Sequence, residues 1–388
     1  MEKCNAFQAF PDMFPAVFRL LPARLSRFLC RAPLISPGNG DILVIVLRIT
    51  FLVENMITQE QIARELGLSV MTVYRCLSGN GCVGASNRKR IEEYVRKHNY
   101  RPNLMAQSLQ RKSSNIIGLV VPSFTWSFYP DIIENIRTAL GLQYNLVLTL
   151  SGDCPDEERR ALEMLARIPV SGILISPTDS RDSLANCRYL EEQHIPFVMF
   201  DRWFDRPGWS YVATDCFTGS VQLVKYLFGL GHRKIVHVGG GAGSFSRQML
   251  EGYRRGLEIC GLVFDPELVF SGAADEKAGF AAMTELLESG KEFTAVHTAS
   301  DPIAVGVLNC CRERGISVPE QISVTGFSDI QIAGQLSVPL TTVKEPTAEL
   351  GREAVSILLG RISGRETADT HKLFTGTFIE RNSCAALK

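Results

Sequence analysis

Short apolar runs alternate with longer amphipathic segments from residue 116 to the end of the chain. Segments such as 155–167 and 275–288 are long enough for helices. A strict alternation of apolar strands and helices predicts parallel sheets covered by helices on both faces. The strand-like runs are residues 116–122, 145–150, 172–176, 196–201, 211–215, 234–240, 268–272, 295–301 and 322–327. One compact sheet of this type does not hold so many strands, so we expect two lobes that join near Asp215.

A different periodicity precedes this region, between residues 56 and 101. Apolar residues recur at helical spacing from Gln59 to Leu66, and Gly67 follows as a residue suited to a left-handed helix end. Ser69 is a natural N-cap for a second helix whose apolar face carries Val73 and Leu77. This pattern predicts a helix-turn-helix, followed by a third helix over about residues 86–98.

The distribution of charge changes the picture of the whole chain. The formal net charge is zero, but residues 56–112 hold ten Lys or Arg and four Asp or Glu, whereas residues 113–388 carry an excess of acidic groups. A small basic module ahead of an acidic one indicates that only the first meets a polyanion. The alternative for residues 56–101 is a three-helix bundle that binds something other than DNA.

The cysteines and the N-terminal residues indicate in which cellular compartment the protein works. The eleven cysteines show no zinc spacing, which favours free thiols in the reducing cytoplasm and neither a metal nor a cofactor. The apolar run 41–53 is interrupted by Arg48, and a membrane span needs about 20 apolar residues. We therefore expect no membrane anchor, and we interpret residues 1–55 as a disordered or mis-annotated extension before a natural start at Met56.

The order of these motifs, with HNYRPN (98–103) and LMAQSLQRKSSNIIGLVVP (104–122) after the three helices, resembles the lactose/galactose repressor (LacI/GalR-type) family of bacterial transcriptional regulators. The resemblance implies a helix-turn-helix domain over 56–101, a hinge helix over 102–112 and a two-lobed, periplasmic-binding-protein-like domain over 113–384. Lobe 1 would comprise about 113–215 plus 346–364, and lobe 2 about 216–343 plus 372–384. The implied partners are a palindromic DNA operator, a second copy of the chain and a small, sugar-like effector.

The resemblance also assigns residues to DNA. Val70 and Met71 would face base edges, and since neither side chain hydrogen-bonds, they would contact thymine methyl groups. Arg75 would contact a guanine or a phosphate, and Tyr74 would reach a phosphate or merely pack. The full set, with the Leu109 wedge that would enter the minor groove from the hinge helix, is Ser69, Val70, Met71, Thr72, Tyr74, Arg75, Asn103, Ala106 and Leu109.

Ligands of parallel sheets bind beyond the carboxyl ends of the strands. That rule, together with the resemblance, nominates Phe128, Tyr129, Asp201, Arg247, Ser300, Asp301, Ser328 and Asp329. The alternative for Phe128 and Tyr129 is packing in a lobe core. The chain departs from the family where Met249 replaces a common arginine, where Ser328 replaces a common aspartate, and where Ala273 and Ala274 replace an aromatic residue. These departures disfavour a standard hexose as the effector.

Catalytic patterns are weak throughout. The glycine-rich stretch 238–246 follows a strand but matches neither the P-loop nor the dinucleotide-binding fingerprint. The six histidines show no metal spacing along the chain. We therefore expect a DNA-binding regulator, more specifically a repressor, and no enzyme. The competing hypotheses are a small-molecule receptor without a DNA role and a sugar-metabolising α/β enzyme.

Overall fold

A computed structural model describes residues 57–77, 83–98, 100, 114–124, 128–178, 180–240, 243–272, 275–365 and 368–387. The chain divides into two compact units, Met1–Asn103 and Leu104–Lys388. The expectations for residues 1–55 and for the hinge helix, with Asn103, Ala106 and Leu109, lie outside the described residues, as do Ala273 and Ala274. Among the described helices, none has the length and apolar character to span a membrane.

Three helices form the described part of the first unit, α4 (Gln59–Leu66), α5 (Val70–Leu77) and α6 (Ala85–Lys97). Thr58 begins α4 with a capping box, in which its hydroxyl and the Gln61 side chain each accept the other residue's backbone N–H. Gly67 ends α4 at φ +64°, as its sequence position predicts. The core is made of Ile62, Ala63, Val73 and Ile91, so the expected helix-turn-helix with a third helix is confirmed.

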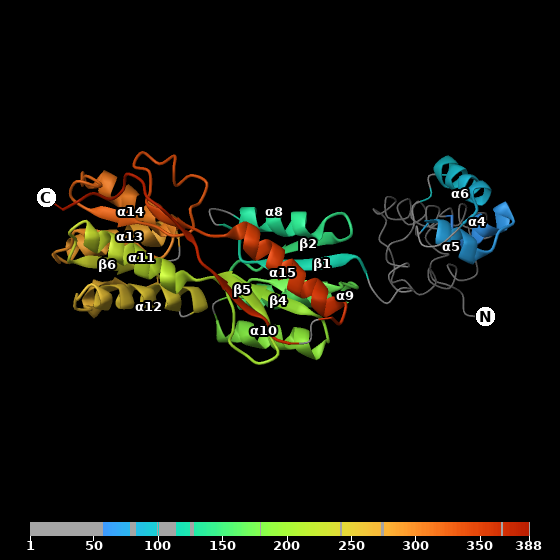
Figure 1. Ribbon diagram of the computed structural model, residues 1–388, viewed down its shortest axis with the longest axis horizontal. Coiled ribbons are helices and arrows are strands. Elements are labelled where there is room, and N and C mark those ends of the chain that lie inside the picture. The colour runs from blue at the N-terminus through green and yellow to red at the C-terminus, as the bar shows by residue number, and fades with distance from the viewer. Residues whose placement is uncertain are drawn as a thin grey trace, which may run out of the picture. The chain divides into compact units, whose positions relative to one another are not determined.

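The first lobe of the second unit is built on a six-stranded sheet in the order β11-β5-β4-β3-β1-β2, with every pair parallel. Its strands are β1 (Ile116–Val121), β2 (Asn145–Leu150), β3 (Gly172–Ile175), β4 (Phe197–Phe200), β5 (Tyr211–Thr214) and β11 (His371–Phe374). Its helices are α8 (Tyr129–Leu140), α9 (Pro155–Arg167), α10 (Arg181–Glu192) and α15 (Thr347–Ile362). Figure 1 shows these helices on both faces of the sheet.

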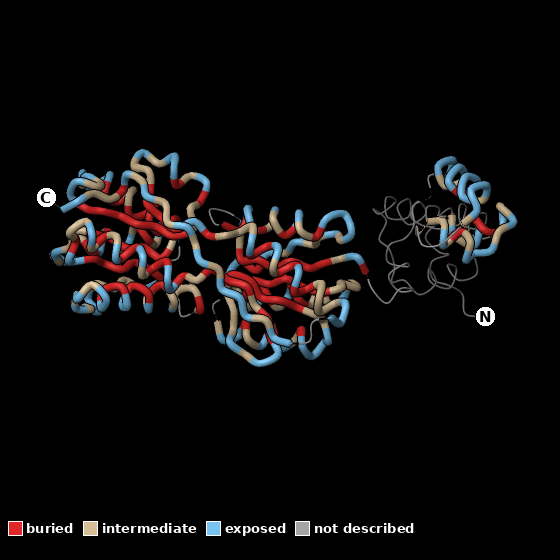
Figure 2. The backbone as a smooth tube through the Cα atoms, viewed as in Figure 1, coloured by how far each residue is buried: buried red, intermediate tan, exposed pale blue. Residues whose placement is uncertain are grey.

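The strands of this lobe bury both faces, which explains their near-continuous apolar sequences. Along β1, Leu119 packs with the core that includes α8 and α15, whereas its neighbour Val120 packs with α9 and α10. Along β3, Leu174 and Ile175 divide in the same way. Successive side chains of a strand point to opposite faces, so each strand supplies two separate cores, drawn as continuous buried segments in Figure 2.

The second lobe has a four-stranded parallel sheet in the order β7-β6-β8-β9. An antiparallel pair, β10 and β12, adjoins it through single bridges from Thr325 to Thr341 and from Ser328 to Lys344. The strands are β6 (Ile235–Val238), β7 (Val269–Phe270), β8 (Ala295–Thr298), β9 (Ser323–Thr325), β10 (Thr342–Lys344) and β12 (Thr377–Ile379). The helices are α11 (Cys216–Gly229), α12 (Ser244–Ile259), α13 (Glu276–Glu288) and α14 (Asp301–Glu313), with a 3-10 turn, η2 (Pro266–Leu268), before β7.

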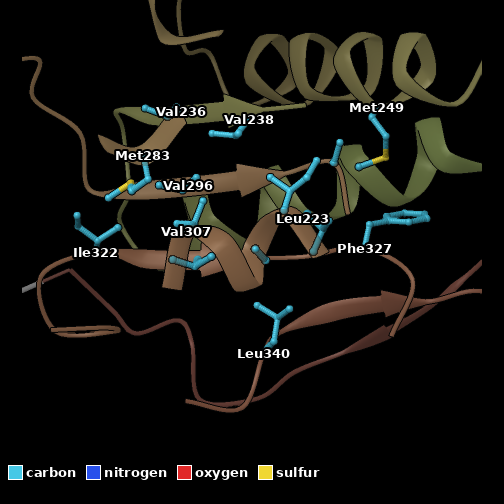
Figure 3. Packing of buried hydrophobic residues seen from close by; sticks show 14 of the residues in the cluster. Leu223, Val236, Val238, Met249, Met283, Val296, Val307, Ile322, Phe327 and Leu340 are labelled. Carbon is cyan, nitrogen blue, oxygen red and sulfur yellow. The ribbon is translucent and has the colours of Figure 1, made fainter. Parts of the chain in front are cut away.

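The core of the second lobe joins the sheet to helices on either side. Val236 and Val296 come from the strands, and Leu223, Met249 and Val307 from three helices. Figure 3 shows these side chains converging around the strands, with Phe327 at the end near Met249. The predicted fold class, a helix-turn-helix domain followed by doubly wound parallel lobes, is therefore confirmed.

The chain passes between the lobes three times: after Thr214, after Glu345 and between Phe374 and Thr377. One expected boundary is wrong. The sequence places residues 372–384 in the second lobe, but His371–Phe374 pairs in parallel with β5 of the first lobe. After α15 has covered the first sheet, the chain is still in the first lobe and runs beside β5 before it crosses over to pair with β10.

Candidate nucleic-acid interface and interlobe site

The start of α5 forms an exposed surface on the first unit. The Ser69 hydroxyl accepts the backbone N–H of Thr72 at 3.1 Å and lies 2.8 Å from the Thr72 hydroxyl, so Ser69 caps the helix as predicted. Val70 and Met71 are 42% and 55% exposed, respectively, although both are apolar and the helix core is adjacent. Arg75 is exposed one turn further on. An apolar pair beside an arginine can contact thymine methyl groups and phosphates or guanine edges.

Contacts from α6 fix this surface in place. The Arg90 guanidinium donates to the Leu66 carbonyl at 2.8 Å, and the Tyr94 hydroxyl donates to the Glu65 carboxylate at 2.8 Å. That hydrogen bond raises the pKa of Tyr94. Both contacts bind α6 to the end of α4 and therefore set the angle of the turn before α5. Tyr74 is half-buried, which is compatible with either of its two expected roles.

The outer side of α6 carries a basic surface. Five cationic side chains are exposed there: Arg88, Lys89, Arg90, Arg96 and Lys97. Lysines and arginines supply the phosphate contacts that dominate affinity for duplex DNA. Five of the ten Lys and Arg counted over residues 56–112 thus lie on accessible positions of α6.

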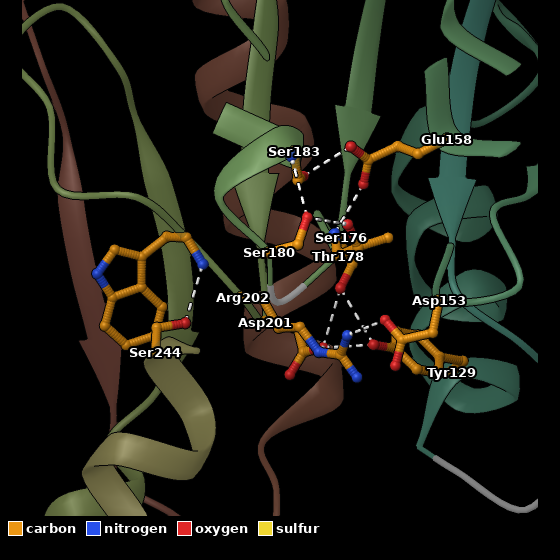
Figure 4. Close-up of polar contacts among 11 residues, drawn as sticks. Tyr129, Asp153, Glu158, Ser176, Thr178, Ser180, Ser183, Asp201, Arg202 and Ser244 are labelled. Atoms are coloured by element: carbon orange, nitrogen blue, oxygen red, sulfur yellow. Dashed lines mark hydrogen bonds and ion pairs between the residues drawn. The ribbon is translucent and has the colours of Figure 1, made fainter. Parts of the chain in front are cut away.

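A buried hydrogen-bonded group lies at the carboxyl ends of the first-lobe strands (Figure 4). The Tyr129 hydroxyl donates to Asp201 Oδ2 at 2.6 Å, and the Ser176 hydroxyl donates to the same oxygen at 3.0 Å. Tyr129 comes from the start of α8, Ser176 follows β3 and Asp201 follows β4, so the parallel topology alone brings them together. Burial and the Asp201 charge raise the pKa of Tyr129 well above its usual value, which keeps the hydroxyl protonated and donating.

An arginine extends this group toward solvent. Arg202 Nη1 lies 2.6 Å from Asp153 Oδ1, and its Nε lies 3.9 Å from Asp201 Oδ2. Burial raises the pKa of Asp201, while Arg202 and the two hydroxyl donors oppose that shift. Asp201 also adopts φ +66°, a left-handed backbone that turns its side chain back toward the strand ends. The Asp201 carboxylate and the Arg202 guanidinium are thus held beyond the carboxyl end of β4.

Phe128 has a different position from that expected of a ligand-binding aromatic residue. Its ring lies 4.8 Å from that of Tyr129, and both residues are buried with Ile132 and Leu350 in the lobe core. Phe128 therefore packs in the lobe core, which is the alternative that the sequence left open. Tyr129 also packs in this core, but its hydroxyl donates to Asp201.

The second-lobe candidates are divided between structural and accessible positions. Asp301 is fully buried; its Oδ1 accepts the Thr342 hydroxyl at 2.6 Å and its Oδ2 accepts the Ile330 N–H at 2.8 Å. Burial raises the pKa of Asp301 to about 6. Asp329 pairs with Arg381 at 2.6 Å. Both carboxylates are thus engaged within their own lobe, while Ser300 and Ser328 remain partly exposed at the strand ends.

The family's arginine position has become part of the core. Met249 is fully buried on α12 among apolar side chains, and Figure 3 shows its side chain directed toward Phe327. Arg247, two residues earlier, is exposed on the same helix. A helix separates residues two apart by about 200°, so Arg247 does not replace an arginine at position 249.

Direct contacts join the two lobes beside this site. The backbone N–H of Trp203 donates to the Ser244 hydroxyl at 3.1 Å, which links the loop after β4 to the first turn of α12. The Trp203 indole stacks on Tyr211 at 4.8 Å. Figure 4 shows this bond beside the Asp201 group. Any change in the relative position of the lobes must therefore alter the surroundings of Trp203.

Several residues of these sites were not singled out from the sequence. Ser176 ends one predicted strand and Asp153 lies three residues after another, so the carboxyl-end rule applied to every strand would have found them. Glu158 is buried in α9 and accepts the Thr178 N–H at 2.7 Å and the Ser183 hydroxyl at 2.6 Å, which holds the loop that carries Ser176. Its position in a charged helical segment gives no sign of this role.

A helix-turn-helix with a basic face, followed by two doubly wound lobes with polar groups at their facing strand ends, defines a ligand-responsive DNA-binding regulator. Residues 58–103 match the profile of bacterial regulatory proteins of the lacI family, and residues 224–384 match a periplasmic-binding-protein-like domain. The transcriptional regulator AscG of Escherichia coli K12 is 31% identical over 339 residues, which cover 85% of this chain and 99% of AscG. The chain belongs to the LacI family of bacterial transcriptional regulators.

Solved structures agree with this assignment. The lac repressor dimer bound to operator and the anti-inducer ONPF has a TM-score of 0.76 and 26% identity, covering 85% of this chain and 99% of that one. The complex of the transcriptional regulator CelR with cellobiose has a TM-score of 0.65 and 30% identity, covering 84% and 99%. Because the relatives are regulators, the hypotheses of a metabolic enzyme and of a receptor without a DNA role are set aside.

Proposed function

We propose that this protein is a homodimeric, cytoplasmic repressor that binds a palindromic operator through α5. Binding of a small effector would change its affinity for that operator. The exposed Val70–Met71 surface at the capped start of α5, next to a basic face, carries the proposal. It is supported by the operator complex of the lac repressor dimer, which has the same fold. Two recognition helices reading two half-sites require a two-fold symmetric protein.

The effector proposed here is a small, uncharged, polyhydroxylated compound. Asp201 and Arg202 can each hydrogen-bond to hydroxyl groups, and Ser300 and Ser328 offer further hydroxyls from the second lobe. The related CelR binds cellobiose. The carboxylates of Asp301 and Asp329 are engaged within the second lobe, and Met249 provides no charge. The second lobe therefore contributes neutral contacts, in contrast to the charged grip typical of hexose-binding relatives.

Selection of binding sites from random duplex DNA at low salt tests the DNA-binding proposal. We expect a short palindrome with thymines opposite Val70 and Met71. Met71→Ala should weaken specific binding by about fivefold and leave non-specific binding unchanged, because a lost methyl contact of about 1 kcal/mol acts only on the matching base. Leu109→Ala should likewise reduce specific binding more than non-specific binding, through loss of the minor-groove wedge.

Arg247→Ala serves as the control, because Arg247 is exposed on the second lobe. Selection that yields no enriched sequence at any salt concentration would contradict the proposal. For the effector, thermal-shift measurements with cellobiose, ribose and other neutral glycosides should reveal a stabilising compound. Asp201→Asn should abolish that shift, whereas Asp182→Asn, at an exposed position of α10, should leave it unchanged.

A further inference from the structure

Glu345 occupies the second of the three crossings between the lobes. It lies between β10 of the second lobe and α15 of the first, and only 3% of it is exposed. The Thr214 hydroxyl, at the end of β5 in the first lobe, donates to Glu345 Oε2 at 2.6 Å. A side-chain hydrogen bond also joins Glu345 to Ser328 of the second lobe. One buried carboxyl group is therefore hydrogen-bonded to hydroxyls from both lobes.

Two acidic groups act on this carboxyl group. Asp201 approaches from the loop after β4, and Asp301 from the first turn of α14. Cys216 lies nearby at the start of α11. Burial, followed by the charges of Glu345, Asp201 and Asp215, raises the pKa of its thiol. Lys344, the preceding residue, is exposed. Burial, followed by the negative charge of Asp201, raises the pKa of Glu345 to about 7.

Hydrogen bonding indicates which of the two acids carries the charge. Asp201 accepts hydroxyls from Tyr129 and Ser176 and has the Arg202 guanidinium 3.9 Å away. Glu345 also accepts two hydroxyls, from Thr214 and Ser328, but among the described residues no ion pair joins it to a cation. Two neighbouring buried carboxylates do not both ionise easily. The negative charge therefore belongs on Asp201 and the proton on Glu345.

We propose that Glu345 is a proton-linked joint between the lobes. As a neutral acid it is tolerated in its buried place between Thr214 and Ser328, whereas an ionised Glu345 gains from hydration and is repelled by Asp201, so that its ionisation favours a looser contact between the lobes although both hydroxyls still donate to it. Near neutral pH, a modest change in proton concentration then shifts the population of joined and loosened lobes. This inference concerns the second unit alone and does not depend on the proposed effector or operator.

The test compares the wild-type chain with Glu345→Gln between pH 5 and pH 8.5, by chemical unfolding. Since the folded state raises the pKa of Glu345, stability is lost as pH rises from the unfolded value of 4.5 toward 7 and is level above it. The ratio of the unfolding constants, wild type over variant, should rise by up to about tenfold per pH unit in that window. A ratio that does not change with pH would overturn the proposal.

The fluorescence of Trp203, taken as the difference between the wild type and Trp203→Phe, reports the lobe contact through its bond to Ser244. It should change with a midpoint near pH 7 and show no transition in Glu345→Gln. Glu349→Gln, which removes an exposed acid four residues further on, in α15, is the control and should keep the wild-type transition. Thr214→Val removes a donor that favours the ionised form, so it should move the midpoint to higher pH. An unmoved midpoint in this variant would overturn the assignment to Glu345 even if Glu345→Gln failed to fold.

Discussion

His237 and His297 face each other across neighbouring strands of the second lobe, with their Nδ1 atoms 2.9 Å apart. They are register partners on β6 and β8, and both are buried. The Nε2 atom of His297 lies 3.1 Å from the Ser220 hydroxyl, and the His237 ring stacks on Tyr253. A hydrogen bond between two Nδ1 atoms requires that at least one ring be unprotonated there, and the burial of both rings disfavours a charge on the other.

Acid should therefore destabilise the second lobe through this pair. Burial lowers the pKa of His297 to about 3 and that of His237 well below its usual value. The unfolded chain binds more protons, so stability is lost as pH falls below about 6.5. Unfolding is measured in the Glu345→Gln background, which removes the opposing dependence of Glu345 and leaves that of Asp301, and the contribution of the histidine pair should appear between pH 6.5 and pH 5. Adding His297→Asn should flatten that slope, and an unchanged slope would show that other groups cause it.

Gly67→Ala should destabilise the helix-turn-helix by about 1 kcal/mol, because Gly67 adopts φ +64° and alanine is strained there. No atom lies within 4 Å of the added methyl group, so the cost is conformational. Gly84→Ala is the matched control: its Cβ would also meet open space, but its φ of −53° suits any residue. Amide exchange of α4 and α5 in the full chain should increase only for Gly67→Ala.

Met249→Arg should destabilise the second lobe and should not supply a ligand-binding arginine of the kind common in relatives. The side chain is fully buried in the second-lobe core, and an unpaired buried charge costs about 3 kcal/mol or more. We expect a lower melting temperature, whereas Met249→Leu should change stability by less than about 1.5 kcal/mol. A Met249→Arg protein with wild-type stability would place this position at an accessible surface.

The ion pair between Asp329 and Arg381 should contribute more than surface pairs do. The two side chains are 13% and 22% exposed, so Asp329→Asn leaves a largely buried guanidinium and should cost about 2 kcal/mol. Glu134→Gln, which breaks an exposed pair with Arg137 on α8, should cost less than about 0.5 kcal/mol. Equal losses from the two substitutions, measured by urea unfolding, would contradict this ranking.

The sequence predicts most of the architecture because the relevant signals are local. Apolar runs and their spacing locate the strands, and the Gly67–Ser69 turn locates the helix-turn-helix. The pairing of β11 with β5 could not be predicted, since His371–Phe374 has no apolar pattern and three of its residues are exposed. It is held by backbone hydrogen bonds to a neighbour distant in sequence.

The candidate site was harder to predict than the fold. The carboxyl-end rule brings Asp201 and Tyr129 together because topology places them, but it does not show whether a carboxylate binds a ligand or is engaged within the protein. Asp301 and Asp329 are of the second kind, held by Thr342 and Arg381. The His237–His297 contact likewise appears only when β6 and β8 are aligned, since the two residues are 60 positions apart.

The three crossings have a consequence for biosynthesis. The first lobe is not a continuous stretch of chain: α15 supplies Leu350, Ala354 and Leu358 to its core, and β11 closes one edge of its sheet. These pieces leave the ribosome after the whole second-lobe sheet has been made. The lobe whose synthesis begins first therefore stays incomplete until the four-stranded sheet of the second lobe has been made. A chain truncated before α15 would leave the apolar face of β3, β4 and β5 exposed to chaperones and proteases.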